Sequence, residues 1–482
     1  MNKFIFSCWW FAALWLLSTE LNATAAPAQS ARLQTPTQAQ KETLAGSRPV
    51  LSGSLSLAEA VRLARERNPS IQVSAQDVTL AEAQVRSARS ARLPVISLGA
   101  AGTLANEDFF YTTGVGPGNI PRNAAGELNV GISLPIYTGG RLLARVDQAI
   151  AERDGAQSDL ATTQLESVVM VKRAYFEVLF TRSQVQVYQE YVAQREASLK
   201  NTRDLFETGK VPRVYVLRDQ TELASAQRAL LAAQTVLGKA LVDLKRGLGV
   251  SLASDFTLSD SLKVTTVSLE LPQLLVRAKQ NNPELVALQS KIKVSEAEIR
   301  MARAAFLPQV NLYAQRELRT PETPGFGSGG SLAVVANWQV VDFGGRNSEV
   351  DRTIANWQKA QLQVDEKEQD LAKLVAQTWL DWQEAKAAID LTQAAVAQAT
   401  EEYRLARERF AIGRSIQVEV LNSSVSLLRA RLENLKAFYD YNVALAQLER
   451  LTGVEIAMEP AAMNDDKPSM KLANPTLTQQ GY

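Results

Sequence analysis

One stretch constrains this fold more than any other: residues 141–206 contain no proline and a single glycine, Gly155. Apolar residues recur there at intervals of three and four, which predicts one continuous helix. At a rise of about 1.5 Å per residue, that helix is about 100 Å long. A break at Thr208–Pro212 separates it from a second predicted helix over about 214–248. A helical hairpin of this length exceeds a compact domain, so we expect it to line or build an extended object.

The composition excludes most catalytic chemistry. The 482 residues include no histidine, and the only cysteine is Cys8. If Cys8 is removed with a signal peptide, the chain cannot form a disulfide, a His/Cys zinc site, a thiol nucleophile or a Ser-His-Asp triad. The formal net charge of +1 gives no reason to expect nucleic acid as a partner. We therefore expect no enzyme activity, no cofactor and no metal site.

The N-terminus has the pattern of a secretory signal peptide over residues 1–25. Lys3 precedes an apolar run at 4–17, and small residues follow at 23–25. An uncleaved anchor is the alternative, but the run is shorter than the ~20 residues that a spanning helix needs. No later stretch reaches 18 consecutive apolar residues, so we expect a mature chain outside the cytoplasm, without a transmembrane helix. Residues 26–54 are predicted to form a flexible leader.

Two halves of the sequence repeat the same landmarks in the same order, which indicates internal duplication. We place repeat one at 55–250 and repeat two at 269–454, joined by a connector at 251–268 and followed by a polar tail at 455–482. The landmark pairs are Asn68-Pro69 with Asn282-Pro283, Leu93-Pro94 with Leu307-Pro308, Gly139-Gly140-Arg141 with Gly344-Gly345-Arg346, Gly209 with Gly413, and Gly249 with Gly453. The predicted helices are about 57–91, 141–206 and 214–248 in repeat one, and about 270–306, 346–408 and 414–452 in repeat two. In each repeat, two short helices placed end to end match one long helix.

Each repeat also contains a pair of alternating segments, at about 95–136 and about 309–341, which predict two β-strands per repeat. Strands of about ten residues can cross a bilayer when tilted. Aromatic residues near the strand ends, Tyr137, Trp338 and Phe343, suit an interfacial girdle. A sheet in a soluble protein is the alternative. Four strands cannot close a barrel and open edges do not occur in lipid, so a membrane barrel requires further copies of the chain: two give eight strands and three give twelve.

This combination of motifs resembles the TolC family of outer-membrane efflux proteins over about residues 55–454. The resemblance rests on the Leu-Pro before each first strand, the Tyr-Thr-Gly-Gly-Arg and Asp-Phe-Gly-Gly-Arg turns that end at Arg141 and Arg346, and the hairpins at Gly209 and Gly413. It implies a mainly α-helical chain that contributes four strands to a trimeric 12-stranded transmembrane β-barrel. A long periplasmic α-helical barrel continues that β-barrel, with an equatorial region built partly from the connector and the tail.

The function implied by the resemblance is that of the outer-membrane channel in a tripartite export system of a Gram-negative bacterium. The channel would be a homotrimer in the outer-membrane lipid bilayer that docks a periplasmic membrane-fusion adaptor. It would receive small molecules such as drugs from an inner-membrane transporter of the RND, ABC or MFS type. A type I protein secretion system is an alternative setting. A periplasmic coiled-coil adaptor or scaffold is the alternative of another class, although adaptors usually carry one hairpin and this chain has two.

The resemblance also places a periplasmic aperture at the hairpin tips. Relatives carry acidic residues at the sixth and ninth positions after the second tip glycine. Here these positions are Glu419, which matches, and Asn422, which does not. The corresponding positions of repeat one are Tyr215 and Arg218, and an ion pair of Arg218 with Glu419 or a neighbouring carboxylate would hold the tips closed. The alternative is that Glu419 and Arg218 are solvated helix charges.

The tip turns are the expected adaptor contacts. These residues are Gly209, Lys210 and Val211 in repeat one, and Gly413, Arg414 and Ser415 in repeat two. A purely structural role of the two glycines in tight chain reversal is the alternative. Elsewhere, Trp379 and Trp382 are expected to pack between helices.

Overall fold

The computed structural model describes residues 49–109, 122–264, 267–320 and 329–454. The chain divides into Met1–Pro49 and Val50–Tyr482, and every described helix and strand belongs to the second unit. The predicted signal peptide at 1–25, most of the predicted leader and the predicted tail at 455–482 lie outside the described residues.

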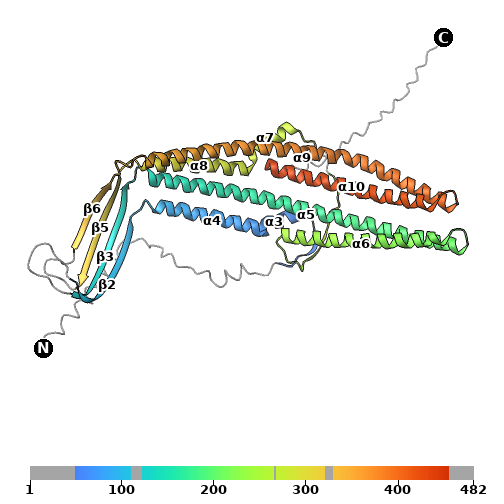
Figure 1. The fold of residues 1–482 in the computed structure, drawn as a ribbon, viewed down its shortest axis with the longest axis horizontal. Helices are drawn as coiled ribbons and strands as arrows, with labels where there is room; N and C mark the ends of the chain where they lie inside the picture. The colour runs from blue at the N-terminus through green and yellow to red at the C-terminus, as the bar shows by residue number, and fades with distance from the viewer. Residues whose placement is uncertain (1–48, 110–121, 265–266, 321–328, 455–482) are drawn as a thin grey trace, which may run out of the picture. The chain divides into compact units, whose positions relative to one another are not determined.

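Two helical hairpins make up most of the described chain (Figure 1). In the first, α5 (Arg141–Glu207) turns back into α6 (Arg213–Gly247); in the second, α9 (Gly345–Ala411) turns back into α10 (Gln417–Thr452). Both long helices contain 67 residues, in agreement with their proline-free sequences. α5 also packs against α10, so the hairpins lie side by side with their turns at the same end. None of the described helices has the length and apolar content that crossing a membrane requires.

Two short helices accompany the other part of each long helix. They are α3 (Leu57–Arg67) and α4 (Pro69–Ser90) beside α5, and α7 (Leu271–Asn281) and α8 (Pro283–Ala304) beside α9. The segments predicted at 57–91 and 270–306 therefore each consist of two helices. The break falls at Asn-Pro in both cases, because the asparagine side chain caps the new helix and proline suits its first position.

The two capping asparagines also join these helices to the ends of the return helices. The Asn68 Nδ2 donates to the Gly247 carbonyl at 3.2 Å, and the Asn282 Nδ2 donates to the Leu451 carbonyl at 3.1 Å. Both asparagines are buried, so their hydrogen bonds satisfy groups that have no access to water. The two halves of the chain thus make the same long-range contact.

Buried and half-buried aromatic residues build the core where short and long helices meet. The Tyr175 hydroxyl donates to the Leu55 carbonyl at 3.0 Å, and the Trp379 Nε1 donates to the Leu269 carbonyl at 3.2 Å. Trp382 is 3% exposed within the second core cluster. The predicted packing role of both tryptophans is therefore confirmed.

A short parallel strand pair, which the sequence did not predict, lies beside the first core. β1 (Ser52–Leu55) pairs with β4 (Asp255–Leu258), and β4 belongs to the predicted connector at 251–268. The prediction of a flexible leader over 26–54 is therefore wrong for residues 52–54. The ladder to β4 and the burial of the adjoining Leu55 hold these residues in place.

The predicted strands form one antiparallel sheet in the order β2-β3-β5-β6. They are β2 (Val95–Phe109), β3 (Arg122–Tyr137), β5 (Gln309–Thr320) and β6 (Gly329–Asn337). Their lengths are 15, 16, 12 and 9 residues, so the expected length of about ten is too short for three of them. The edge strands β2 and β6 each have one neighbour within the described chain.

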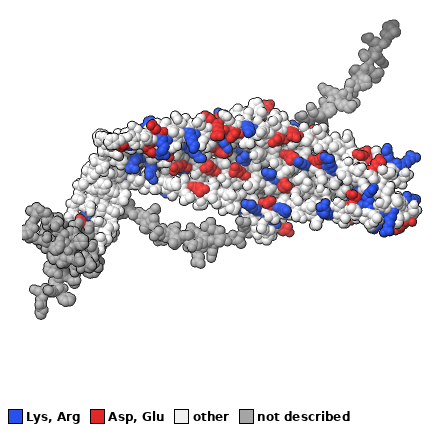
Figure 2. Space-filling view, viewed as in Figure 1, with Lys and Arg blue, Asp and Glu red and all other residues white. Residues whose placement is uncertain are grey.

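The sheet register places the predicted apolar residues on one face. Ile96 lies opposite Ile132, Ile132 opposite Ala314, and Ala314 opposite Leu332. Directly opposed residues share a face of the sheet. Ile96 is 72% exposed and Leu332 is 74% exposed, so the chain itself does not cover this face. Figure 2 shows few charged side chains over the sheet and many over the helices.

β6 ends at Asn337, short of the predicted limit near 341, because Arg346 ties down the connection to α9. Its guanidinium donates to the Asp342 carboxylate at 2.8 Å and to the carbonyl oxygens of residues 339 and 340. Within this connection Phe343 adopts a φ of 53° and is fully exposed. A side chain in the left-handed region that buries no surface within its own chain is unusual.

Candidate functional site at the hairpin tips

The two tip turns share one backbone geometry. Gly209 has a φ of 70° and Gly413 a φ of 72°, a conformation that glycine adopts at little cost. The N–H of the following residue, Lys210 or Arg414, bonds to the carbonyl five positions earlier at 2.9 and 2.8 Å. This Schellman pattern satisfies carbonyl groups at the ends of α5 and α9. No atom lies within 4 Å of a Cβ built on either glycine, so the backbone conformation and not lack of space favours glycine.

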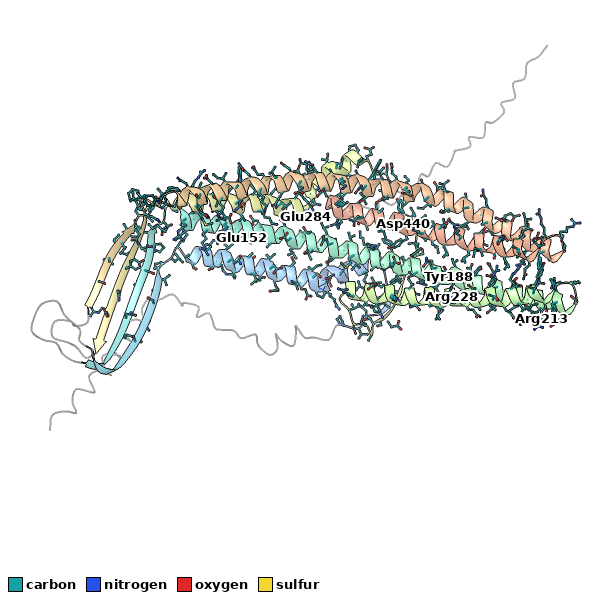
Figure 3. All side chains as sticks on the ribbon, viewed as in Figure 1. Glu152, Tyr188, Arg213, Arg228, Glu284 and Asp440 are labelled. Atoms are coloured by element: carbon teal, nitrogen blue, oxygen red, sulfur yellow. The ribbon has the colours of Figure 1, made fainter. Side chains whose placement is uncertain are left out.

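The tips present basic side chains to solvent. Lys210, Arg213 and Arg414 are exposed, whereas Val211 and Ser415 are half-buried. Figure 2 shows Lys and Arg gathered at the free ends of the hairpins, and Figure 3 labels Arg213 there. The residues predicted to contact an adaptor thus belong to a mainly basic, accessible surface.

A hydrogen bond joins the two hairpins close to their tips. The Gln417 Nε2 donates to the Tyr215 carbonyl at 3.0 Å. Gln417 is 3% exposed, and its Oε1 has no hydrogen-bond partner among the described residues. Tyr215, a predicted aperture residue, therefore takes part in the contact through its backbone. The sequence did not single out Gln417, because only the packing of α10 against the first hairpin buries it.

Glu419, Asn422 and Arg218 lie on exposed helix surfaces beside this contact. The Ser415 hydroxyl donates to the Glu419 carboxylate at 2.5 Å, and the N-terminal dipole of α10 favours an acidic group in its first turn. Within the described chain, Arg218 forms no ion pair with Glu419 or any other carboxylate. The predicted pairing of Arg218 therefore does not form inside a single copy.

A buried carboxylate lies inside the first hairpin near its tip. Asp219 is 1% exposed, and its Oδ2 accepts hydrogen bonds from Thr202 at 2.7 Å and from Ser198 at 3.4 Å. Its Oδ1 has no partner in the described part of the chain. One oxygen of this buried carboxylate thus lacks a hydrogen bond, and any rearrangement that supplies a donor to it would be stabilised.

Arg195 is a second buried charge in the same hairpin. It is 2% exposed, and none of its side-chain nitrogens hydrogen-bonds to a described residue. Its guanidinium lies 5.0 Å from the centroid of the Tyr191 ring, in a cation–π arrangement. Burial raises the pKa of the Tyr191 hydroxyl, while Arg195 opposes this shift. Helix spacing did not identify Arg195 or Asp219, since both resemble solvated charges in the sequence.

Farther from the tips, ion pairs join α5 to α10. Lys172 pairs with Glu449, and their side chains are only 14% and 12% exposed. Glu190 pairs with Arg431 at 2.5 Å. Burial, together with a hydrogen bond to Glu177, raises the pKa of the neighbouring Tyr439 to about 12. These contacts tie the hairpins together along their length.

A groove of about 720 Å³ opens between α5, α9 and α10. Asp381, Glu384 and Asp440 line it together with Lys436 and Arg173. Partial burial in the groove raises the pKa of Asp440; Lys436 lowers it and Glu384 raises it further. Among the described residues, no group of three His, Cys, Asp or Glu is arranged to hold a metal ion.

A family model described as "Outer membrane efflux protein" matches the chain twice, over residues 60–250 and over residues 274–454. Together these matches cover more than half of the chain and correspond to the two halves that share landmarks.

Two curated relatives extend over most of the chain. The outer membrane protein TolC of Escherichia coli is 22% identical over 453 residues, which are 88% of this chain and 89% of that protein. The alkaline protease secretion protein AprF of Pseudomonas aeruginosa is 23% identical over 427 residues, 85% of this chain and 87% of the relative.

Solved structures share the fold. The outer membrane protein VceC of Vibrio cholerae matches with a TM-score of 0.72 at 18% identity, over 83% of this chain and 97% of that one. The outer-membrane channel OprN matches with a TM-score of 0.73 at 17% identity, over 82% and 89% of the two chains. The paired hairpins, the four-stranded sheet and the double family match lead to one assignment: the chain belongs to the outer membrane efflux protein family, to which TolC belongs, and is an outer-membrane exit duct.

Proposed function

We propose that three copies of this chain assemble so that their sheets close a 12-stranded barrel in the outer membrane and their hairpins form a periplasmic tunnel. The open four-stranded sheet is the observation that carries this proposal, because β2 and β6 have unpaired outer edges within the described chain. Each unsatisfied backbone group in lipid costs several kcal/mol. Further copies of the chain remove this cost, because their edge strands can pair with β2 and β6. Two copies would give eight strands and an interior filled by side chains, whereas three leave a lumen.

We also infer that the two halves of the chain arose by tandem duplication. The double match of the family model supports this inference. The equivalent hydrogen bonds of Asn68 and Asn282 support it independently. A trimer of duplicated chains would place six similar units around the tunnel.

Two neighbouring substitutions on β6 test the membrane barrel. Leu332 belongs to the apolar face of the sheet, and Ser331 points to the opposite face. An arginine on the lipid face of a barrel costs about 2–4 kcal/mol near the bilayer midplane, whereas the lumen face tolerates it. We expect Leu332→Arg to lower the amount of protein in outer-membrane fractions and the conductance in planar bilayers, with Ser331→Arg close to wild type. Equal behaviour of the two variants would contradict a lipid-facing sheet.

Glu419 is proposed to form a ring of three carboxylates at the periplasmic aperture, with Asn422, Tyr215 and Arg218 lining the same constriction. Such a ring favours cations. Glu419→Gln is expected to shift the reversal potential in a salt gradient toward that of a non-selective channel. Asn422→Asp would add a second acidic ring and shift the reversal potential toward that of a more cation-selective channel. If neither variant changes selectivity, Glu419 is a solvated helix charge.

We propose that the tip turns contact a periplasmic adaptor, through Gly209, Lys210 and Val211 in the first turn and Gly413, Arg414 and Ser415 in the second. The exposed cations of both turns support this role. Reversing the charge at Lys210 and Arg414 is expected to reduce co-purification of the adaptor. Reversal at Arg228, which lies along α6 away from the tips (Figure 3), provides the matched control and should leave co-purification unchanged.

The proposed cargo is a small toxic molecule delivered by an inner-membrane transporter. One relative is a probable efflux pump outer membrane protein, TtgC of Pseudomonas putida, 23% identical over 78% of both chains. The match to AprF, named for protease secretion, supports protein export as the second candidate. A deletion strain distinguishes them: drug efflux predicts increased sensitivity across a panel of compounds, and protein export predicts a missing secreted polypeptide.

A further inference from the structure

The two hairpins share one packing pattern. Gly209 and Gly413 follow the long helices in the same kind of turn, so each position of the first hairpin corresponds to the position 204 residues later in the second. On each return helix one buried position recurs every seven residues, which is typical of a helix that packs along its length on a partner. These residues are Asp219, Ala226, Ala233 and Ala240 on α6, and Ser423, Ala430, Ala437 and Ala444 on α10.

The long helices differ at the matching positions. The buried residues of this set are Thr181, Arg195 and Thr202 on α5, and Ala385, Ala399 and Ala406 on α9. The first hairpin therefore buries a cation and an anion, Arg195 and Asp219, where the second hairpin buries alanine and serine. Burying a charge carries a desolvation cost, so two charges in one of two otherwise similar interfaces indicate a specific role there.

The hydrogen-bond donors of Asp219 both lie on α5. Its Oδ2 accepts hydrogen bonds from Thr202 at 2.7 Å and from Ser198 at 3.4 Å. The corresponding residues of α9 are Ala406 and Glu402, of which the first has no side-chain donor and the second carries the same charge. A return helix with aspartate at this position would therefore lose both hydrogen bonds against α9 and would face a second carboxylate.

The apolar part of the interface does not distinguish the two long helices. The hairpins lie side by side with their turns at the same end (Figure 1), and α5 packs against both return helices, α6 and α10. Alanines at seven-residue intervals on α6 and α10 offer nearly the same surface to either long helix. Specific pairing then requires a group that one partner accepts and the other rejects.

We propose that Asp219 restricts α6 to packing against α5, because its buried carboxylate finds donors on α5 and is rejected by α9. Arg195 supports the same choice, since α5 carries this positive charge seven positions before Thr202 and α9 has Ala399 there. A buried polar residue that specifies helix pairing at a cost in stability is established in coiled coils. The Oδ1 of Asp219, which has no partner among the described residues, is consistent with such a cost.

Moving the carboxylate to the second hairpin of the full-length protein tests the proposal. Ser423→Asp places a buried carboxylate against Ala406 and Glu402, so amide hydrogen exchange at the tip of this hairpin should accelerate about tenfold. Ser423→Asp/Ala406→Thr/Glu402→Ser supplies the donors that α5 has and should return exchange close to the wild-type rate. The first hairpin of the same molecule is the internal control, and its exchange should stay unchanged. A silent Ser423→Asp variant, or a triple variant that exchanges as fast as the single one, would overturn the proposal.

The reverse change in the first hairpin is the second measurement. Thr202→Ala makes α5 resemble α9 and should accelerate exchange at the first tip about tenfold. Thr202→Ala/Asp219→Ser should restore the slow exchange, because the serine hydroxyl at the equivalent position of α10, Ser423, bonds within its own helix.

Thr181→Ala is the matched control. Thr181 is 1% exposed and belongs to the same set of positions on α5, but its hydroxyl donates to the Glu177 carbonyl of its own helix at 2.8 Å. Asp219→Ser should therefore not offset any effect of Thr181→Ala. Equal coupling of Asp219 to Thr181 and to Thr202 would contradict a carboxylate that recognises its donors on α5.

Discussion

Four glycines have nearly the same backbone conformation, but only two of them lie close to a neighbouring segment. Their alanine variants therefore separate the cost of the left-handed backbone from the cost of a steric clash. Gly209 and Gly249 have φ values of 70° and 69° and both follow a helix with the same Schellman hydrogen bonds. A Cβ on Gly209 would meet no atom within 4 Å, whereas a Cβ on Gly249 would lie 2.6 Å from the Arg67 carbonyl oxygen. Alanine at either site costs about 1–2 kcal/mol for the left-handed backbone.

Only Gly249→Ala adds a steric cost. Relieving the contact moves the chain next to the Asn68–Gly247 hydrogen bond, and losing a buried hydrogen bond costs about 1–3 kcal/mol. We therefore expect Gly209→Ala to lower the free energy of unfolding by about 1–2 kcal/mol and Gly249→Ala to lower it by about 2–5 kcal/mol.

Urea unfolding of the detergent-solubilised protein, followed by far-ultraviolet circular dichroism, measures the difference. Gly413 and Gly453 repeat the comparison in the second half, with φ values of 72° and 69°. A Cβ on Gly453 would lie 2.5 Å from the Asn281 carbonyl oxygen, and one on Gly413 would meet nothing. Equal losses at all four positions would contradict a steric cost at Gly249 and Gly453, because the backbone conformation alone would then account for the effect.

Three further predictions follow from buried and half-buried charges. Lys172→Met should lower the free energy of unfolding by about 3–5 kcal/mol by leaving the Glu449 carboxylate without its lysine, and Lys172→Met/Glu449→Met should recover most of it in a double-mutant cycle. The raised pKa of Asp440 means that the folded chain binds this proton more tightly than the unfolded chain does. The free energy of unfolding therefore falls as the pH rises above the ordinary pKa of 3.8. Asp440→Asn should raise the urea midpoint at pH 7 and leave it unchanged below pH 3.8. Arg346→Ala should cost at least about 3 kcal/mol, since several charge-assisted hydrogen bonds are lost. Arg141→Ala should cost less than about 1.5 kcal/mol, because among the described residues Arg141 forms one hydrogen bond, at 3.5 Å.

The order and length of the long helices and the sites of the turns can be predicted from the sequence, because helix periodicity and the positions of glycine and proline determine them locally. The 67-residue helices, the turns at Gly209 and Gly413, and the apolar face shared by Ile96 and Leu332 all follow from spacing. Period-two alternation fixes the face of a strand, and the register then brings the apolar faces together.

The buried polar contacts near the tips and the connection after β6 cannot be predicted in this way. Gln417, Asp219 and Arg195 have polar or charged side chains that look solvated until packing between segments buries them. The repeated Gly-Gly-Arg motif also gives an alignment of the two halves that is wrong by one residue. The motif aligns Arg141 with Arg346, but the helices begin after Gly140 and Gly344, so Arg346 lies one position farther into its helix. Arg346 consequently holds the connection after β6 in place, whereas the hydrogen bond that Arg141 forms in the described part of the chain is a long one to Gln309.

Native mass spectrometry of the protein extracted from outer membranes measures directly how many chains form the proposed tunnel. We expect a single dominant species with three times the mass of the extracted chain, because three open sheets are needed to enclose a lumen and satisfy every strand edge. A stable monomer, or a dimer as the dominant species, would contradict the proposed tunnel.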